Sequence, residues 1–121
     1  MQTAMQTHES KLVLSTPDHF HIILIDDIVS CNEVNSKTTV TLQNGEQYSV
    51  DLTLDKMRQK INREDFFQPQ DNCLINGQYV NKLQRIEKPE LLLENGQVFS
   101  ISPGRKDEVL RFLNKITRIQ I

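Results

Sequence analysis

Two stretches, "KTTVTLQNGEQYSV" and "ELLLENGQVFSI", constrain the fold of this chain more than any other feature. In the first, Asn44-Gly45 separates two runs in which apolar and polar residues alternate, and in the second, Asn95-Gly96 separates two runs rich in apolar residues. Asn-Gly flanked by alternation is the strongest short-range signal of a β-hairpin, because both positions of a tight hairpin turn need positive φ. The sequence therefore predicts two hairpins and an antiparallel sheet.

A short helix is predicted between the hairpins, over "TLDKMRQKI". The hydroxyl of Thr53 can accept a hydrogen bond from a free N–H of the first turn, so Thr53 is a suitable N-cap. Leu54, Met57 and Ile61 then share one face at helical spacing, and this face is expected to be buried.

A second helix is predicted at the end of the chain, in "SPGRKDEVLRFLNKITRI", where Pro103 suits a first turn. Earlier in the chain, "HFHIILIDDIV" is typical of a strand with a turn near Asp26-Asp27, and "NKLQRIE" of a further strand. The expected fold class is mostly β, built from antiparallel strands and hairpins, with a short middle helix and a C-terminal helix. The apolar stripe of the last helix is expected at Val109, Leu110, Leu113 and Ile116.

The length of 121 residues corresponds to one domain. We expect residues 1–15 to be a loosely ordered N-terminal segment and residues 16–121 to form the domain. The net charge of −2 argues against a strongly basic nucleic-acid binder, although a local basic patch can exist under such a total. Residues 105–121 carry +3, and the rest of the chain carries −5.

The sequence indicates a cytoplasmic protein without a membrane segment. No apolar signal-peptide core is expected in "MQTAMQTHESK", and the run Ile22–Ile25 is far too short to span a bilayer. Cys31 and Cys73 lie far apart without a CxxC partner, and they are interpreted as reduced packing residues.

An enzyme is not expected, because no GxSxG, HExxH, P-loop or GxGxxG motif occurs. His19 and His21 share a strand face, but no further ligand is placed by sequence to complete a tetrahedral metal site. An edge strand explains the pair better, and we expect no metal, no cofactor and no small-molecule substrate. Asp26-Asp27 is interpreted as a turn with solvated acids.

The ordered set of segments resembles a LytTR DNA-binding domain, the output module of many bacterial two-component response regulators. The resemblance runs from about His19 to Leu113. It rests on "IDDIVSCNEVNSKTTVTLQNGEQYSVDLTLDKMRQKI", then on "FFQPQDNCLINGQYVNKLQRIE", and finally on "LLLENGQVFSISPGRKDEVLRFL". It implies an elongated β fold whose loops enter the major groove of double-stranded DNA.

The resemblance also implies which residues face DNA, although the basic residues of the family's second block are missing here. The family's His falls on Gln70, and its later Arg falls on Arg105. Asn76 is expected to be structural, since Asn-Gly is turn chemistry. Arg pairs with guanine and Asn or Gln with adenine, whereas Asp71 can only accept and repels phosphates. The expected DNA-binding residues are Asn35, Lys37, Gln68, Gln70, Asp71, Asn72, Arg105 and Lys106.

Two functions follow from the resemblance. The first is a sequence-specific transcriptional regulator of LytTR type, without a receiver domain in the chain. The alternative is a degenerate LytTR-like protein-interaction module that binds DNA weakly or not at all and pairs with another regulator. A homodimer is compatible with either function, because family members commonly bind paired sites.

Overall fold

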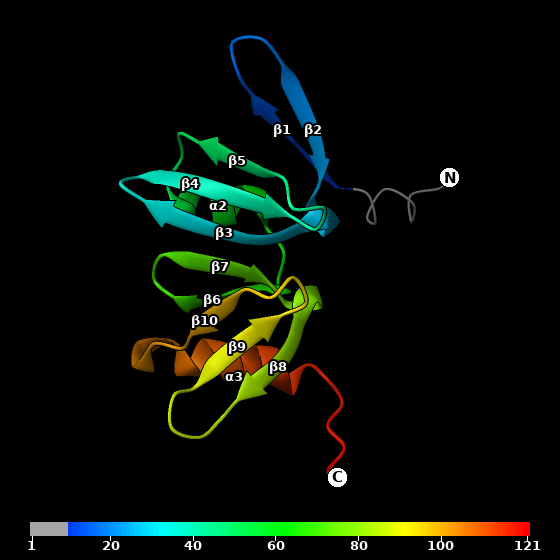
Figure 1. Ribbon diagram of the computed structural model, residues 1–121, viewed down its shortest axis with the longest axis vertical. Helices are drawn as coiled ribbons and strands as arrows, with labels where there is room; N and C mark the ends of the chain where they lie inside the picture. Colours follow the sequence, from blue (N-terminus) through cyan, green and yellow to red (C-terminus); the bar gives the residue numbers. More distant parts are fainter. Residues whose placement is uncertain (1–9) are drawn as a thin grey trace, which may run out of the picture.

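Three antiparallel sheets follow one another along the long axis of the protein in the computed structural model, which describes residues 10–121 (Figure 1). The first sheet is a hairpin of β1 (Lys11–Ser15) and β2 (Phe20–Leu24). Residues 1–9 of the expected loose segment lie outside the described residues, whereas residues 11–15 form β1. A short 3-10 turn, η1 (Ile25–Asp27), leads from β2 into the second sheet, where the sequence predicts a turn.

The second sheet has five strands in the order β5-β4-β3-β7-β6. Its central strands β3 and β7 pair directly, with Cys31 opposite Leu74. Asn76 is fully buried and its side-chain amide donates to the carbonyl of Ile28, the structural role expected of it. The strands are β3 (Ile28–Val34), β4 (Lys37–Leu42), β5 (Gln47–Val50), β6 (Phe66–Gln70) and β7 (Cys73–Asn76).

The third sheet lies at the other end of the molecule and packs with the last helix. Its order is β10-β9-β8, and a 3-10 turn, η2 (Gly77–Tyr79), connects it to β7. A further 3-10 turn, η3 (Pro103–Arg105), precedes the helix α3 (Lys106–Asn114). The strands are β8 (Val80–Gln84), β9 (Glu90–Leu93) and β10 (Val98–Ser100).

Both faces of the five-stranded sheet are covered, so the protein has two hydrophobic clusters. One cluster holds the buried face of α2 (Leu54–Ile61) and residues of the first hairpin, and the other holds residues of the third sheet and of α3. Successive side chains of a strand point to opposite faces, so neighbouring residues enter different clusters. The neighbours that divide in this way are Ile28 and Val29, Phe66 and Phe67, and Leu74 and Ile75.

The predicted middle helix is confirmed with its cap and its buried face. The hydroxyl of Thr53 accepts from the N–H of Lys56, and Leu54, Met57 and Ile61 are buried. The helix ends at Ile61, and the C-cap residue Asn62 has φ 49°, the left-handed conformation that is typical of helix ends.

Both Asn-Gly hairpins form, but their turns differ from the prediction. Within the two Asn-Gly pairs, only the glycines, Gly45 and Gly96, have positive φ, at 92° and 93°. The loops are longer than two residues, and the side chain of Asn44 accepts from the N–H of Glu46. This is the hairpin in which a turn is followed by a left-handed Gly, so Asn supplies a side-chain hydrogen bond rather than positive φ.

The buried face of α3 differs from the predicted stripe. Val109 is buried as predicted, but Leu110 and Ile116 are half exposed and Phe112 is buried instead. The ring of Phe112 stacks on Phe67 of β6 at 4.4 Å between centroids. Phe112 also lies directly against Gly77, where any side chain would collide with the ring. The aromatic contact therefore sets the rotation of the helix and turns Leu110 outward.

Candidate nucleic-acid interface

Three chain reversals lie side by side along one edge of the molecule, on the left in Figure 1. They are the β3–β4 turn, the β6–β7 turn and η3 with the start of α3. The backbone N–H of Glu33 donates to the carbonyl of Asn72 at 2.8 Å, which joins the first two. The Nε of Arg105 donates to Asp71 at 2.9 Å, which joins the second and third. We call residues 35–37, 70–72 and 105–106 the turn face.

The β3–β4 turn is a true two-residue hairpin turn. Asn35 and Ser36 have φ of 53° and 66°, the positive values that a tight hairpin requires at both positions. Both residues and Lys37 are exposed. An amide and an ammonium group therefore project together from this end of the turn face.

The β6–β7 turn places Asp71 and Asn72 at its tip. The pairing of β6 with β7 shifts register between Phe67 and Gln70, and Pro69 lies in this irregular stretch, where the ladder needs no N–H donor. Gln70 donates from its side-chain amide to the carbonyl and hydroxyl oxygens of Ser100, at 2.8 and 2.7 Å. Gln70 therefore braces the turn against β10, while Asp71 and Asn72 remain exposed.

Arg105 stands at the end of η3 with two carboxylate partners. Its Nε donates to Asp71, and its Nη1 donates to Glu108 at 3.0 Å. Partial burial lowers the pKa of Arg105, but these two acids outweigh that effect and raise it, so the side chain stays charged. The guanidinium that the family resemblance expects to face a base is thus paired with two carboxylates of the protein itself.

Glu108 is the acceptor that organises the interior side of the turn face. It accepts from the backbone N–H of Gln68 at 2.8 Å and forms an ion pair with Arg58 of α2 at 2.7 Å, in addition to its bond from Arg105. Its side chain is only 13% exposed. Burial by itself raises the pKa of Glu108, but the Gln68 N–H and the two guanidinium groups bring it below its ordinary value of 4.5.

Gln68 points into the protein rather than toward solvent. The residue is 4% exposed, accepts from Arg58 Nη1 at 2.6 Å and donates to the carbonyl of Asp71. It therefore shapes the β6–β7 turn from behind, and the structure brings it to the Arg58–Glu108 pair instead of the outer surface.

Of the eight predicted site residues, seven gather on the turn face and Gln68 lies beneath it. Sequence reasoning missed Arg58 and Glu108, which hold Gln68 and Arg105 in place. The spacing of Arg105 and Glu108, three residues apart at the start of a helix, was a signal for their contact. No sequence signal pointed to Arg58, because its partners are distant in the chain.

The His and Cys side chains of the described residues lie outside the turn face. Within residues 10–121, no group of three His, Cys, Asp or Glu side chains could hold a metal ion. The ring of His21 lies 4.9 Å from that of Tyr48, between ring centres. Burial raises the pKa of Cys31 to about 12 and that of Cys73 to about 11, so both thiols stay protonated at neutral pH. Among the described residues, none of the helices is both long enough and apolar enough to cross a bilayer.

A family model of the LytTr DNA-binding domain matches residues 18–114. The chain belongs to the LytTR family of DNA-binding domains. The resemblance drawn from the sequence and the predicted mostly β fold class are thereby confirmed.

A solved structure with the same fold is a LytTr DNA-binding domain from Bacillus cereus, described as part of a methyl-accepting/DNA response regulator. It aligns with 14% sequence identity and a TM-score of 0.74, covering 87% of this chain and 97% of that chain. No curated protein matches the chain.

The turn face of this LytTR domain offers the groups that base edges and phosphates require. Asn72 and Asn35 can each donate and accept, while Lys37 and Lys106 supply charge. Arg105 has a fork that fits guanine, but two carboxylates occupy it here. The same surface therefore carries both groups whose chemistry suits DNA contacts and carboxylates that pair with one of those groups.

Proposed function

We propose that this LytTR domain is a sequence-specific transcriptional regulator that reads the major groove through its turn face. It acts in the bacterial cytoplasm as the output module of a two-component system. The observation that carries the proposal is the alignment of three reversals, with Asn35, Asn72 and Arg105 as candidate base readers and Lys37 and Lys106 as phosphate contacts. In this proposal Gln68 positions the middle turn, and Gln70 braces it.

Arg105 is the candidate reader that decides the proposal. Binding to guanine requires Arg105 to exchange Asp71 for the base edge, while Glu108 keeps the guanidinium near the surface. The two ion pairs keep the Arg105 side chain ordered before DNA binds. The exchange breaks only the pair with the exposed Asp71, and such an exposed ion pair contributes little energy. Paired recognition sites would indicate that two copies act together.

The test is selection of bound sequences from random duplex DNA, followed by affinity measurements on the best sequence. Arg105→Ala is expected to lose about 1–3 kcal/mol and to relax preference at one base pair. Arg105→Lys keeps the charge but not the fork, so it should recover only part of that loss. Arg111→Ala is the matched control, because Arg111 is an exposed Arg of the helix α3 that follows η3 and lies outside the turn face.

A second candidate function is a protein-interaction module that modulates another regulator. It is favoured by the neutralisation of Arg58 and Arg105 by Glu108 and Asp71, which removes positive charge where DNA would bind. An unchanged affinity of Arg105→Ala for the selected sequence, or a selection that yields no preferred sequence, would reject direct reading and support this candidate.

A further inference from the structure

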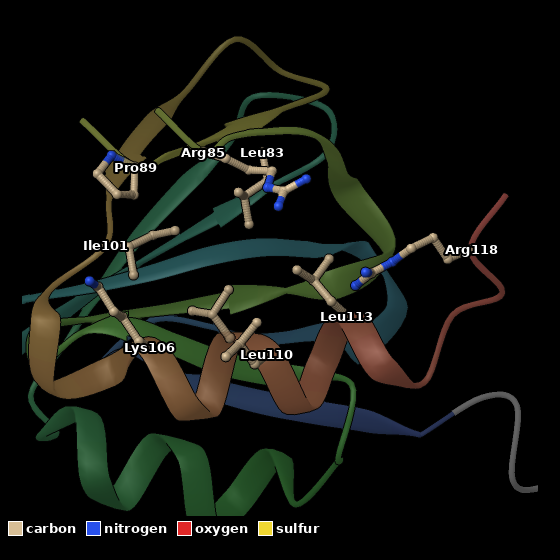
Figure 2. Close-up of a pocket in the computed structure, with 9 residues that line it drawn as sticks. Leu83, Arg85, Pro89, Ile101, Lys106, Leu110, Leu113 and Arg118 are labelled. Atoms are coloured by element: carbon tan, nitrogen blue, oxygen red, sulfur yellow. The ribbon is translucent and has the colours of Figure 1, made fainter. Parts of the chain in front are cut away.

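A groove on the far side of α3 from Glu108 has the features of a ligand site. It lies between α3 and the third sheet, is open to solvent, and has a volume of about 480 Å³. Figure 2 shows Leu110 and Leu113 of the helix rising toward Leu83 and Ile101 of the opposite wall. Leu110 is 50% exposed, so this apolar floor is open to solvent in the described structure.

Three basic side chains surround the apolar floor. Lys106 stands at one end of the groove and Arg118 at the other, and Arg85 stands on the sheet wall (Figure 2). Among residues 10–121, none of the three belongs to an ion pair, and the groove lining contains no acid. Within the described part of the chain these three cations therefore have no ion-pair partner, in contrast to Arg58 and Arg105.

This combination selects a ligand by its chemistry. An apolar cavity of a few hundred cubic ångströms with a few polar groups is the usual form of a small-molecule site. Apolar walls favour a hydrophobic body, and cations without protein partners favour a carboxylate, which Arg can bind through two hydrogen bonds. The cations at both ends of the groove favour a short, compact ligand over a long segment of a partner protein.

We propose that this groove binds a small organic acid with a compact apolar body, whose carboxylate pairs with Arg85 or Arg118 while the body packs on Leu110 and Leu113. The site goes beyond DNA recognition and lies on the opposite face of α3 from Glu108. Its occupancy is measurable on the DNA-free protein, so the outcome is independent of whether the turn face binds DNA.

The test uses 2-naphthoate as the probe on the full chain, with binding followed by isothermal titration calorimetry and by amide chemical shifts. 2-Naphthylmethanol presents the same body without charge, and inorganic phosphate presents charge without the body. The expected result is saturable one-site binding of 2-naphthoate, about tenfold tighter than either control compound, which corresponds to one charge-assisted contact. The shifted amides should include those of Leu83, Ile101 and Leu113.

Variants then locate the site. The double substitution Arg85→Gln and Arg118→Gln should weaken 2-naphthoate at least fivefold and leave 2-naphthylmethanol unchanged. Leu110→Glu should weaken both compounds, and because Leu110 is half exposed this change should preserve folding. Arg111→Gln is the matched control on the same helix and should change neither.

Three results with the small probes would overturn the proposal. They are absence of saturable binding, equal affinity for the acid and the alcohol, and affinity for the acid that the double variant leaves intact. Saturable binding of an acidic amphipathic peptide without binding of 2-naphthoate would overturn it as well, and would assign the groove to a protein partner.

Discussion

At the residue scale, Asp71 is an expected DNA-binding residue that also forms an ion pair with Arg105. It lies 90% exposed at the tip of the β6–β7 turn and holds Arg105. Asp71→Asn removes a competitor for Arg105 and a negative charge beside the phosphates. We expect DNA to bind more tightly by roughly 1 kcal/mol, with thermal stability unchanged because an exposed ion pair contributes little. Equilibrium titration on the selected sequence measures the change.

The same substitution in the Arg105→Ala background separates the two possible causes. If Asp71 acts by occupying Arg105, its removal should have no further effect once Arg105 is absent. If it acts by repelling phosphates, the gain should persist in the double variant. Weaker binding by Asp71→Asn would contradict both, and would make Asp71 a direct contact to a cytosine amino group.

At the scale of elements, Glu108 fastens α3 to β6 and to α2. Glu108→Gln leaves Arg58 and Arg105 without their shared carboxylate, and the free energy of unfolding should fall by about 1–3 kcal/mol at about pH 7. Because folding lowers the pKa of Glu108 below 4.5, its contribution is present above that pH and is lost as the pH falls through the folded-state pKa. Urea unfolding at several pH values measures both effects.

The difference in stability between the natural chain and Glu108→Gln should therefore shrink below pH 4.5. Asp107→Asn is the control, since Asp107 is an exposed acid in the same helical turn. A difference that stays constant into acid would show that the charge of Glu108 contributes nothing to the junction.

The β3–β4 turn gives a second prediction at this scale. Ser36 has φ 66°, a conformation that costs a residue with a side chain about 1 kcal/mol relative to glycine. Ser36→Gly should raise the free energy of unfolding by roughly 0.5–1 kcal/mol, because it relieves that cost within an Asn-Gly turn. DNA affinity should not change, since Asn35 and Lys37 stay in place. A loss of affinity would make the Ser36 hydroxyl a DNA contact.

At the scale of the whole molecule, DNA binding must work with a net charge of −2. The turn face contributes Lys37, Arg105 and Lys106, and Arg58 lies just behind it. About three or four neutralised phosphates give a slope of about −3 to −4 for the logarithm of the binding constant against that of salt concentration. Fluorescence anisotropy across salt concentrations measures the slope, and a value near −8 would place the binding surface elsewhere.

Much of this architecture was predictable, because alternation and helical spacing report directly on burial. The two hairpins, the capped helix α2 and its buried Leu54 and Met57 follow from such local patterns. The position of Phe112 did not, because its rotation depends on a ring contact with Phe67, 45 residues earlier by sequence number. For the candidate site, the sequence predicted which segments take part but not which of their side chains contact one another.

The contacts within the site escaped prediction for the same physical reason. Arg58, Gln68 and Glu108 come from three elements, and nothing local to any of them indicates the others. The tight turn at Asn35-Ser36 was also missed, since a serine at positive φ is uncommon and the expected signal is a glycine.

The division of neighbouring residues between two clusters has a consequence for how the sequence of such a domain can change during evolution. A layer of peptide backbone separates Ile28 from Val29 and Phe66 from Phe67. A substitution that changes side-chain volume in one cluster is therefore compensated by further substitutions in the same cluster. The packing of the cluster on the other face of the sheet does not have to change. The residues of the two clusters can therefore be substituted independently during evolution, while the strands between the clusters keep their register. Such independence is consistent with a shared backbone at 14% sequence identity.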